Sequence, residues 1–194
     1  MTTEVVVKLA ARDPWSFTVL DALKYKFGIG SVVGVERLKS WRLDFALASE
    51  EEALVVTDRI LNGTALLANP NRDIWRVGGG SGLDLPGATR DLADRMDNFF
   101  AVRVTDRDDL VGRSMLGVLR KRLRIVEVTG VAFSLVWVLE FDHPGERSFE
   151  LAEEIAVARS WRRGLLANPH SQDALVLRLE DYLSRRAPGD EAEA

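Results

Sequence analysis

The chain has 194 residues, a formal net charge of −4 and no cysteine. That length fits one or two domains. The lack of cysteine excludes disulfides, thiolate nucleophiles and cysteine zinc sites, and the acidic balance argues against a general nucleic-acid binder. No apolar run approaches the roughly 20 residues that span a bilayer, and residues 1–4 lack the features of a signal peptide. We therefore expect a cytoplasmic protein without nucleic-acid or membrane partners.

The first predicted elements are a strand and a helix. Over residues 4–9, Val5, Val7 and Leu9 fall on one face of an alternating pattern, which is typical of a strand. Asp13 suits the N-cap of a helix, because its carboxylate can accept from the free amides of the first turn. Pro14 suits the first helical position, where no amide donor is needed. The helix is expected to run to about Phe27, where glycines follow.

The following elements are predicted from turn chemistry and helix caps. In chain order they are strands over residues 32–38 and 41–47 joined by a tight hairpin at Lys39-Ser40, a helix from the Ser49 cap to about Ala68, and a strand over residues 73–77.

The chain contains an internal repeat. The segment Leu-Leu-Ala-Asn-Pro occurs at residues 66–70 and again at residues 165–169. Trp41 falls on Trp137 at an offset of 137 − 41 = 96, and neighbouring apolar residues match at the same offset. A period this long indicates two similar small domains rather than a solenoid.

The second copy predicts the same order of elements. They are a strand over residues 99–105, a helix from Asp109 to about Leu123, strands over 126–133 and 135–141, a long helix from about Arg147 to Asn168, and a strand over 173–180. Each copy is therefore expected to be β-α-β-β-α-β. That order predicts an α+β protein with two tandem ferredoxin-like domains, each an antiparallel sheet with both helices on one face.

The expected boundaries follow the composition. Copy one covers residues 1–77 and a divergent copy two covers residues 98–186. Residues 78–97 begin with a glycine-rich run and predict a linker. Residues 187–194 are acidic and predict a disordered tail.

No catalytic, cofactor or metal site is predicted. The glycine run at residues 78–82 is not followed by the Gly-Lys-Ser/Thr of a phosphate loop. His143 and His170 are the only histidines, and neither has further metal ligands at suitable spacing. No nucleophile with a neighbouring base is evident.

Two basic clusters and one tryptophan leave alternatives open. The run Arg120-Lys121-Arg122-Arg124 and the pair Arg162-Arg163 are either solvated helix faces or sites for an acidic surface or a phosphate. Trp161 aligns with Asn62 at an offset of 99, so it lies outside the shared pattern. It suits either an inter-domain or partner contact or a buried position.

Copy one resembles the PurS family, the small accessory subunit of phosphoribosylformylglycinamidine synthase in purine biosynthesis. The resemblance rests on the first strand at residues 4–9, the Asp13-Pro14 pair and the Leu-Leu-Ala-Asn-Pro segment followed by a short strand. Copy two keeps that segment but has Asp109-Leu110 in place of Asp-Pro.

The resemblance implies a non-catalytic scaffold. PurS-like domains form dimers that join a synthetase subunit and a glutaminase subunit, so this chain is similar to such a dimer fused into one polypeptide, a pseudo-dimer open to further homo-oligomerisation. Fusion raises the effective concentration of one half for the other. The residues expected to contact the partners are Asn69, Pro70, Asn168, Pro169, Trp161, Arg162 and Arg163.

Two other functions remain open. A tandem ACT-like small-molecule sensor also pairs ferredoxin-like domains and binds ligands between them, although it usually has an Asp-x-Pro-Gly-like loop after the first strand. Residues 12–15 lack that glycine. A small enzyme on the same fold is a third alternative, because function is grafted onto folds, but the scarcity of histidine and lack of cysteine disfavour it.

Overall fold

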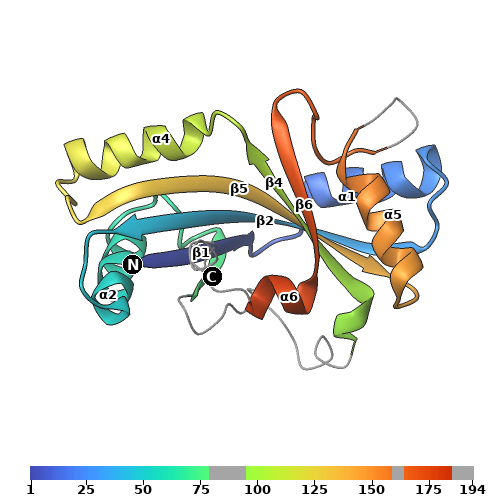
Figure 1. The fold of residues 1–194 in the computed structure, drawn as a ribbon, viewed down its shortest axis with the longest axis horizontal. Helices are drawn as coiled ribbons and strands as arrows, with labels where there is room; N and C mark the ends of the chain where they lie inside the picture. Colours follow the sequence, from blue (N-terminus) through green and yellow to red (C-terminus); the bar gives the residue numbers. More distant parts are fainter. Residues whose placement is uncertain (79–94, 159–163, 185–194) are drawn as a thin grey trace, which may run out of the picture.

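The computed structural model describes residues 1–78, 95–158 and 164–184 (Figure 1). Its strands form one six-stranded antiparallel sheet in the order β3-β1-β2-β5-β4-β6. The strands are β1 (Thr2–Leu9), β2 (Val32–Phe45), β3 (Asp73–Gly78), β4 (Phe99–Asp106), β5 (Val128–Phe141) and β6 (Gln172–Arg178). The helices are α1 (Pro14–Asp21), α2 (Glu50–Gly63), α4 (Leu110–Gly117), α5 (Glu146–Ala156) and α6 (Leu179–Ser184). The prediction of an α+β protein is confirmed.

The two halves of the chain carry equivalent elements in the same order. Helix α4 and strand β5 begin and end 96 residues after α1 and β2. Both α1 and α4 continue as short π-helical segments, η1 (Ala22–Lys26) and η3 (Val118–Arg122). The expected N-caps are present, because Asp13 accepts from the amide of Trp15 and Asp109 accepts from that of Gly112.

The predicted hairpin at Lys39-Ser40 is wrong. Strand β2 runs without interruption through both residues, and β5 does the same in the second half. A two-residue hairpin requires positive φ angles that favour glycine or asparagine, and Lys39-Ser40 offers neither. Ser40 is instead buried in the sheet. Each half is therefore observed as β-α-β-α-β, and not as the expected β-α-β-β-α-β.

The long strands β2 and β5 pair about a local two-fold axis. Lys39 lies opposite Leu135, which is its own counterpart because 135 − 39 = 96. On either side of this pair, Trp41 lies opposite Phe133 and Arg37 lies opposite Trp137. The halves thus meet as the subunits of an isologous dimer do, each through the same strand.

Each half also lends a helix to the other half. One core cluster joins β1, β2 and α2 of the first half with Met115 and Leu116 of α4. The other joins β4, β5 and α5 of the second half with Val19 and Leu23 from the first. Figure 1 shows the result, with α2 and α4 near one end of the long strands and α1 and α5 near the other. Neither half encloses its core alone.

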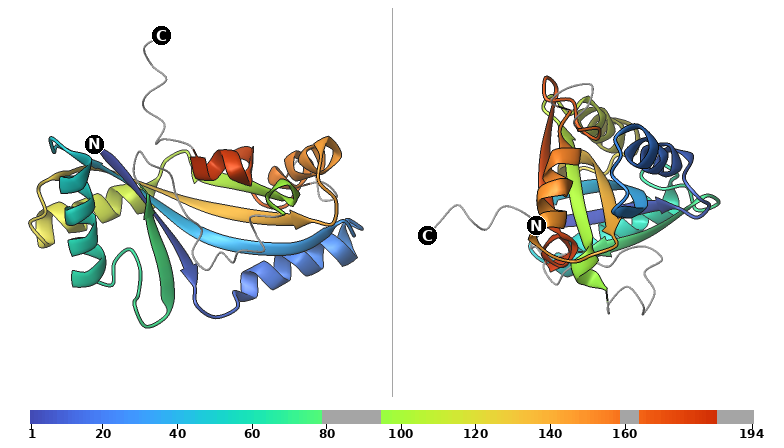
Figure 2. Two further views of the ribbon diagram at one scale, coloured as in Figure 1. Left: turned by 90° about the horizontal axis from the view of Figure 1, so that it is seen from below. Right: turned by 90° about the vertical axis from the view of Figure 1, so that its right-hand side faces the viewer.

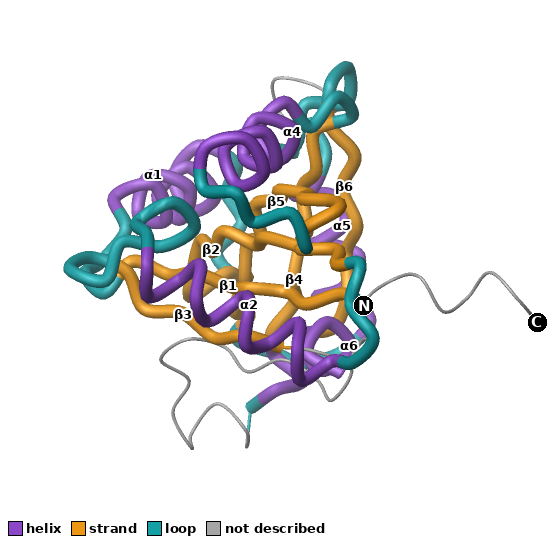
Figure 3. Tube along the Cα trace, turned by 90° about the vertical axis from the view of Figure 1, so that its left-hand side faces the viewer, coloured by secondary structure: helices purple, strands orange, loops and turns teal. Residues whose placement is uncertain are grey.

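The opposite face of the sheet is covered by α6. Leu179 and Tyr182 of this helix pack on a third apolar cluster. The sheet residues of that cluster are Val6, Leu38, Ala101, Val136, Val138 and Leu177. In Figure 2 (left), α6 lies across the sheet from α1. In Figure 3, α1 and α4 lie above the sheet and α6 lies below it.

The predicted ends of the second helix of each half are wrong. Helix α2 ends at Gly63, where the amide and hydroxyl of Thr64 both donate to the Ile60 carbonyl, at 3.1 and 2.7 Å. Helix α5 ends at Ala156, and Val157 is already extended and bridges to Ala167. The Leu-Leu-Ala-Asn-Pro segments therefore follow the helices instead of closing them.

Among the described residues, no helix has the length and apolar character needed to cross a membrane. The boundaries of the linker and the tail stay predictions, since residues 79–94 and 185–194 lie outside the described part of the chain.

Candidate functional site

The first Asn-Pro segment forms a tight turn leading into β3. The side-chain oxygen of Asn69 accepts from the amide of Asn71 at 3.0 Å, which makes an Asx turn. Its backbone carbonyl accepts from the amides of Arg72 and Asp73 at 3.0 and 2.7 Å. In return, the Asp73 carboxylate accepts from the Asn69 amide at 2.9 Å. The backbone groups and the side-chain oxygen of Asn69 are thus used within the turn, while Pro70 is exposed.

The second segment repeats this turn before β6. The Asn168 side-chain oxygen accepts from the amide of His170 at 3.0 Å, and its carbonyl accepts from those of Ser171 and Gln172. The Gln172 side chain takes the place of the carboxylate and accepts from the Asn168 amide at 2.9 Å. Pro169 is half-buried.

The two turns lie far apart in the sheet. They precede β3 and β6, which are the opposite edge strands in the order β3-β1-β2-β5-β4-β6. The structure therefore does not gather Asn69, Pro70, Asn168 and Pro169 into one site. It places two equivalent corners on two sides of the molecule. The other expected contact residues, Trp161, Arg162 and Arg163, lie outside the described residues.

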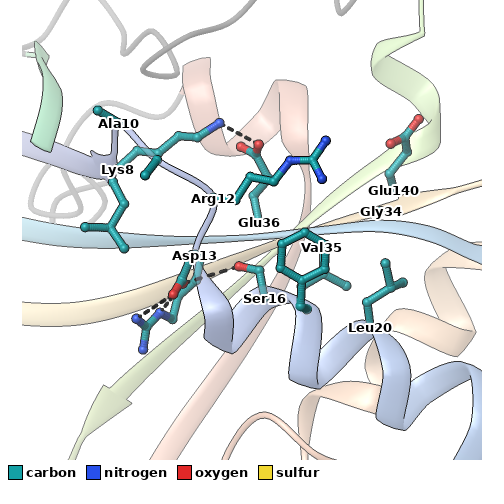
Figure 4. A pocket seen from close by; sticks show the side chains of 14 residues that line it. Lys8, Ala10, Arg12, Asp13, Ser16, Leu20, Gly34, Val35, Glu36 and Glu140 are labelled. Atoms are coloured by element: carbon teal, nitrogen blue, oxygen red, sulfur yellow. Dashed lines mark hydrogen bonds and ion pairs between the residues drawn. The ribbon is translucent and has the colours of Figure 1, made fainter. Parts of the chain in front are cut away.

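A pocket of about 340 Å³ lies beside the loop that joins β1 to α1 (Figure 4). Pairing between β1 and β2 stops at Val7 and Lys39, so the edge of β2 beyond that point is open toward the loop. Side chains from the loop, from α1 and from β2 line the pocket, and Glu140 of β5 joins them from the second half. The pocket thus belongs mainly to the first repeat, with Glu140 added from the second.

The charges of this pocket are mostly paired. Arg37 donates to both carboxylate oxygens of Asp13, with Nε–Oδ2 and Nη2–Oδ1 distances of 2.7 and 3.2 Å. Lys8 forms an ion pair with Glu36. Arg12 lies in the same pocket with its guanidinium carbon 5.7 Å from the centre of the Phe17 ring. A mixed lining of this kind suits a small zwitterion better than a strongly charged ligand.

A polar network is buried beneath α6, on the other face of the sheet. The Glu4 carboxylate accepts from the hydroxyls of Ser40 and Tyr182, the latter at 3.2 Å. Arg103 lies 3.8 Å from the same carboxylate oxygen and donates to the Ser134 hydroxyl at 3.1 Å. Burial raises the pKa of Tyr182, and the neighbouring Glu4 carboxylate raises that pKa further. The tyrosine is therefore held neutral, as a donor that fixes α6 to the sheet.

Sequence reasoning missed this network because its members come from five separate elements. Glu4 and Tyr182 are 178 residues apart, and no spacing rule joins them. The sequence gives one weak indication of the network. Glu4 directly precedes the apolar run Val5, Val6 and Val7, so its carboxylate is expected to lie beside the core.

The described residues contain no group of three or more histidine, aspartate or glutamate side chains placed to hold a metal ion. His143 is exposed, with its Nε2 atom 4.0 Å from the Asp142 carboxylate, and His170 is exposed on the second Asn-Pro turn.

The chain matches no protein-family model, and no curated protein matches it.

Proposed function

We propose that this chain is a non-catalytic scaffold subunit of phosphoribosylformylglycinamidine synthase in cytoplasmic purine biosynthesis, a PurS-like dimer fused into one polypeptide. In this proposal each repeat is a ferredoxin-like unit in which the two expected middle strands are joined into one continuous strand, β2 in the first half and β5 in the second. The observation that carries it is the isologous pairing of β2 with β5 about the Lys39–Leu135 pair. That arrangement is the one expected when two copies of a dimer-forming domain are joined.

The placement of the Asn-Pro turns supports a bridging role. A protein that joins two larger subunits needs two separated contact surfaces held at a fixed spacing. The turns before β3 and β6 provide equivalent corners at opposite edges of one sheet. Since the halves have diverged in sequence, one corner can be specialised for the glutaminase and the other for the synthetase.

The test is reconstitution with the synthetase and glutaminase subunits of the same organism, followed by glutamine-dependent amidine formation. We expect activity only when this chain is present. Pro70→Glu, at an exposed position, is expected to weaken binding of one partner, and Pro169→Glu that of the other, in pairwise gel filtration. A chain that neither binds the pair nor raises their activity contradicts the proposal.

The second candidate is a small-molecule sensor of the tandem ACT type, and the pocket beside the β1–α1 loop favours it. That pocket follows the first strand, and Glu140 of the second repeat joins a lining that otherwise comes from the first repeat. A ligand bound there would contact both halves. A thermal-shift screen with free amino acids tests this function, because a ligand that binds only the folded state must raise Tm.

A further inference from the structure

A second hollow, of about 540 Å³, lies on α4, on η3 and on the loop that leads into β5. We call it the basic hollow. Its lining includes the cations Arg113, Arg120, Lys121 and Arg124, together with Leu116 and Val126, and contains no carboxylate among the described residues.

Helical spacing brings these cations to one side. Arg113, Leu116 and Arg120 follow one another at intervals of three and four residues, which places them on one helix face. All four cations are exposed, and no ion pair joins any of them to a carboxylate in the described residues. Although the chain has a net charge of −4, the basic hollow therefore gathers four positive side chains that have no carboxylate partner among the described residues.

Helix electrostatics explain part of this cluster. Cations in the last turn of a helix interact favourably with its negative end, and Arg120, Lys121 and Arg122 occupy the last turn of η3. This interaction with the helix end does not explain Arg124, because η3 ends at Arg122.

Arg124 occupies a backbone position that disfavours side chains. Its φ angle is 59°, in the left-handed region. The equivalent position of the first half is Gly28, with a φ angle of 72°, and glycine is the residue that tolerates this conformation without cost. A non-glycine residue held there is destabilising, and such strain is concentrated at functional sites.

The cluster belongs to one half only. At the positions equivalent to Arg113, Arg120, Lys121 and Arg124, the first half has Phe17, Lys24, Tyr25 and Gly28. The fold therefore does not require the cations, because the same elements form without three of them.

We propose that the basic hollow binds an oligophosphate, meaning two or more adjacent phosphoryl groups, either free or carried by a nucleotide. Arginine forks match phosphate oxygens in bidentate geometry. One phosphate group carries at most about two negative charges at neutral pH and would leave half of the four cations uncompensated. Adjacent phosphoryl groups can meet all four, and the apolar Leu116 and Val126 side chains leave room for a nonpolar part of the ligand. This binding does not depend on the scaffold function.

The first test is calorimetric titration of the full chain with inorganic tripolyphosphate at about 0.15 M salt, where long-range effects beyond roughly 8 Å are screened. Arg120→Glu is expected to weaken binding at least tenfold. Lys24→Glu, at the equivalent position of the first half, changes the net charge equally and is expected to leave the affinity within about threefold. Equal losses in both variants would show nonspecific attraction and overturn the proposal.

Arg124→Gly separates binding from folding. This variant removes one cation and relieves the left-handed strain, so we expect weaker tripolyphosphate binding together with a Tm raised by roughly 2–4 °C. Because the variant is expected to be more stable, a loss of binding cannot come from unfolding. Unchanged affinity in Arg124→Gly would remove Arg124 from the site and contradict the proposal.

Further titrations identify the source of the phosphates. Tighter binding of ATP than of tripolyphosphate indicates a nucleotide, and equal binding indicates the phosphate chain alone. Orthophosphate is expected to bind at least tenfold more weakly than either. If no oligophosphate binds at millimolar concentration, or if polyglutamate binds more tightly than all of them, the basic hollow is not an oligophosphate site.

Discussion

Equivalent side chains make different contacts in the two halves. The indole nitrogen of Trp41 donates to the Leu67 carbonyl at 3.1 Å, and its ring lies 4.6 Å from that of Phe133. The indole nitrogen of Trp137 is buried without a hydrogen-bond partner in the described residues, and the Arg37 guanidinium carbon lies 5.9 Å from its ring centre. The two halves therefore keep the same backbone elements, although equivalent side chains in them no longer make the same contacts.

Tyr182 is expected to make folding sensitive to alkali. Its pKa is raised in the folded state by burial and by Glu4, whereas that of an unfolded tyrosine is about 10. The stabilisation from neutral Tyr182 is therefore complete below pH ~10 and is lost as the pH rises toward the folded-state pKa. Tyr182→Phe should cost about 1 kcal/mol at pH 8, through the lost hydrogen bond to Glu4. Urea unfolding should show this difference shrinking above pH ~10.

A spectroscopic control isolates the side chain. The chain has two tyrosines, and the other, Tyr25, is 85% exposed. In a Tyr25→Phe background, tyrosinate absorbance reports Tyr182 alone and should appear only as the protein unfolds. Absorbance that rises at pH ~10 while the fold is intact would show that Tyr182 is not buried against Glu4.

Two glycines of α4 are expected to respond to alanine in opposite ways. A Cβ atom at Gly112 would lie 2.3 Å from the Asp109 carboxylate and 2.4 Å from the Val131 carbonyl, whereas one at Gly117 would meet nothing within 4 Å. Gly112→Ala should destabilise the fold by about 1–3 kcal/mol, because there is no space for a methyl group between α4 and the Val131 carbonyl. Gly117→Ala should stabilise it by about 0.5–1 kcal/mol through helix propensity. Thermal unfolding measures both, and a stabilising Gly112→Ala would contradict the packing of α4 on β5.

Among the elements, the Asn-Pro turns carry a prediction that separates structure from binding. Asn69→Ala loses the side-chain acceptor for the Asn71 amide and should lower the free energy of unfolding by about 1 kcal/mol. Asn69→Asp keeps an acceptor oxygen and should restore most of this loss. Chemical denaturation compares the two variants. If both are equally destabilised, the amide nitrogen has a role that the turn geometry does not show.

Helix starts and strand positions could be predicted because their causes are local. Asp13 and Pro14 define the start of α1, and Ser49 accepts from the Glu52 amide at the start of α2. The continuity of β2 through Lys39-Ser40 could not be predicted in this way. Two polar residues between apolar runs suggest a turn, yet Ser40 is polar because it meets the Glu4 carboxylate, a partner 36 residues away.

For the candidate sites, too, the features with local causes could be predicted from the sequence, and those that depend on distant contacts could not. The basic run of the second half is visible in sequence, because its members are neighbours on one helix. What the structure adds is the left-handed φ angle of Arg124 and the unpaired state of the cluster in the described residues. The pocket beside the β1–α1 loop could not be predicted, since Glu140 reaches it through pairing of β5 with β2, opposite Gly34.

The two halves of the molecule depend on each other. Strand β2 without β5 would present a long unpaired edge, and Val19 and Leu23 of the first half would lose the part of their core cluster that β4, β5 and α5 supply. A homodimer of the first half would also place Lys39 opposite a second Lys39, where the full chain has Leu135. Like charges directly opposite in a sheet are destabilising, so the mixed pair is the favoured one.

We therefore expect residues 1–78 and 95–194, expressed separately, to be poorly folded alone and to assemble when mixed. Circular dichroism should show strand and helix signal that rises on mixing, and light scattering after gel filtration should give one copy of each half. Leu135→Lys in the second half restores the unfavourable opposition and should weaken assembly by about 1 kcal/mol, roughly fivefold in Kd. Leu135→Val keeps an apolar partner for Lys39 and serves as the control. A first half that unfolds cooperatively as a monomer would show that its core does not need the residues Met115 and Leu116 of α4.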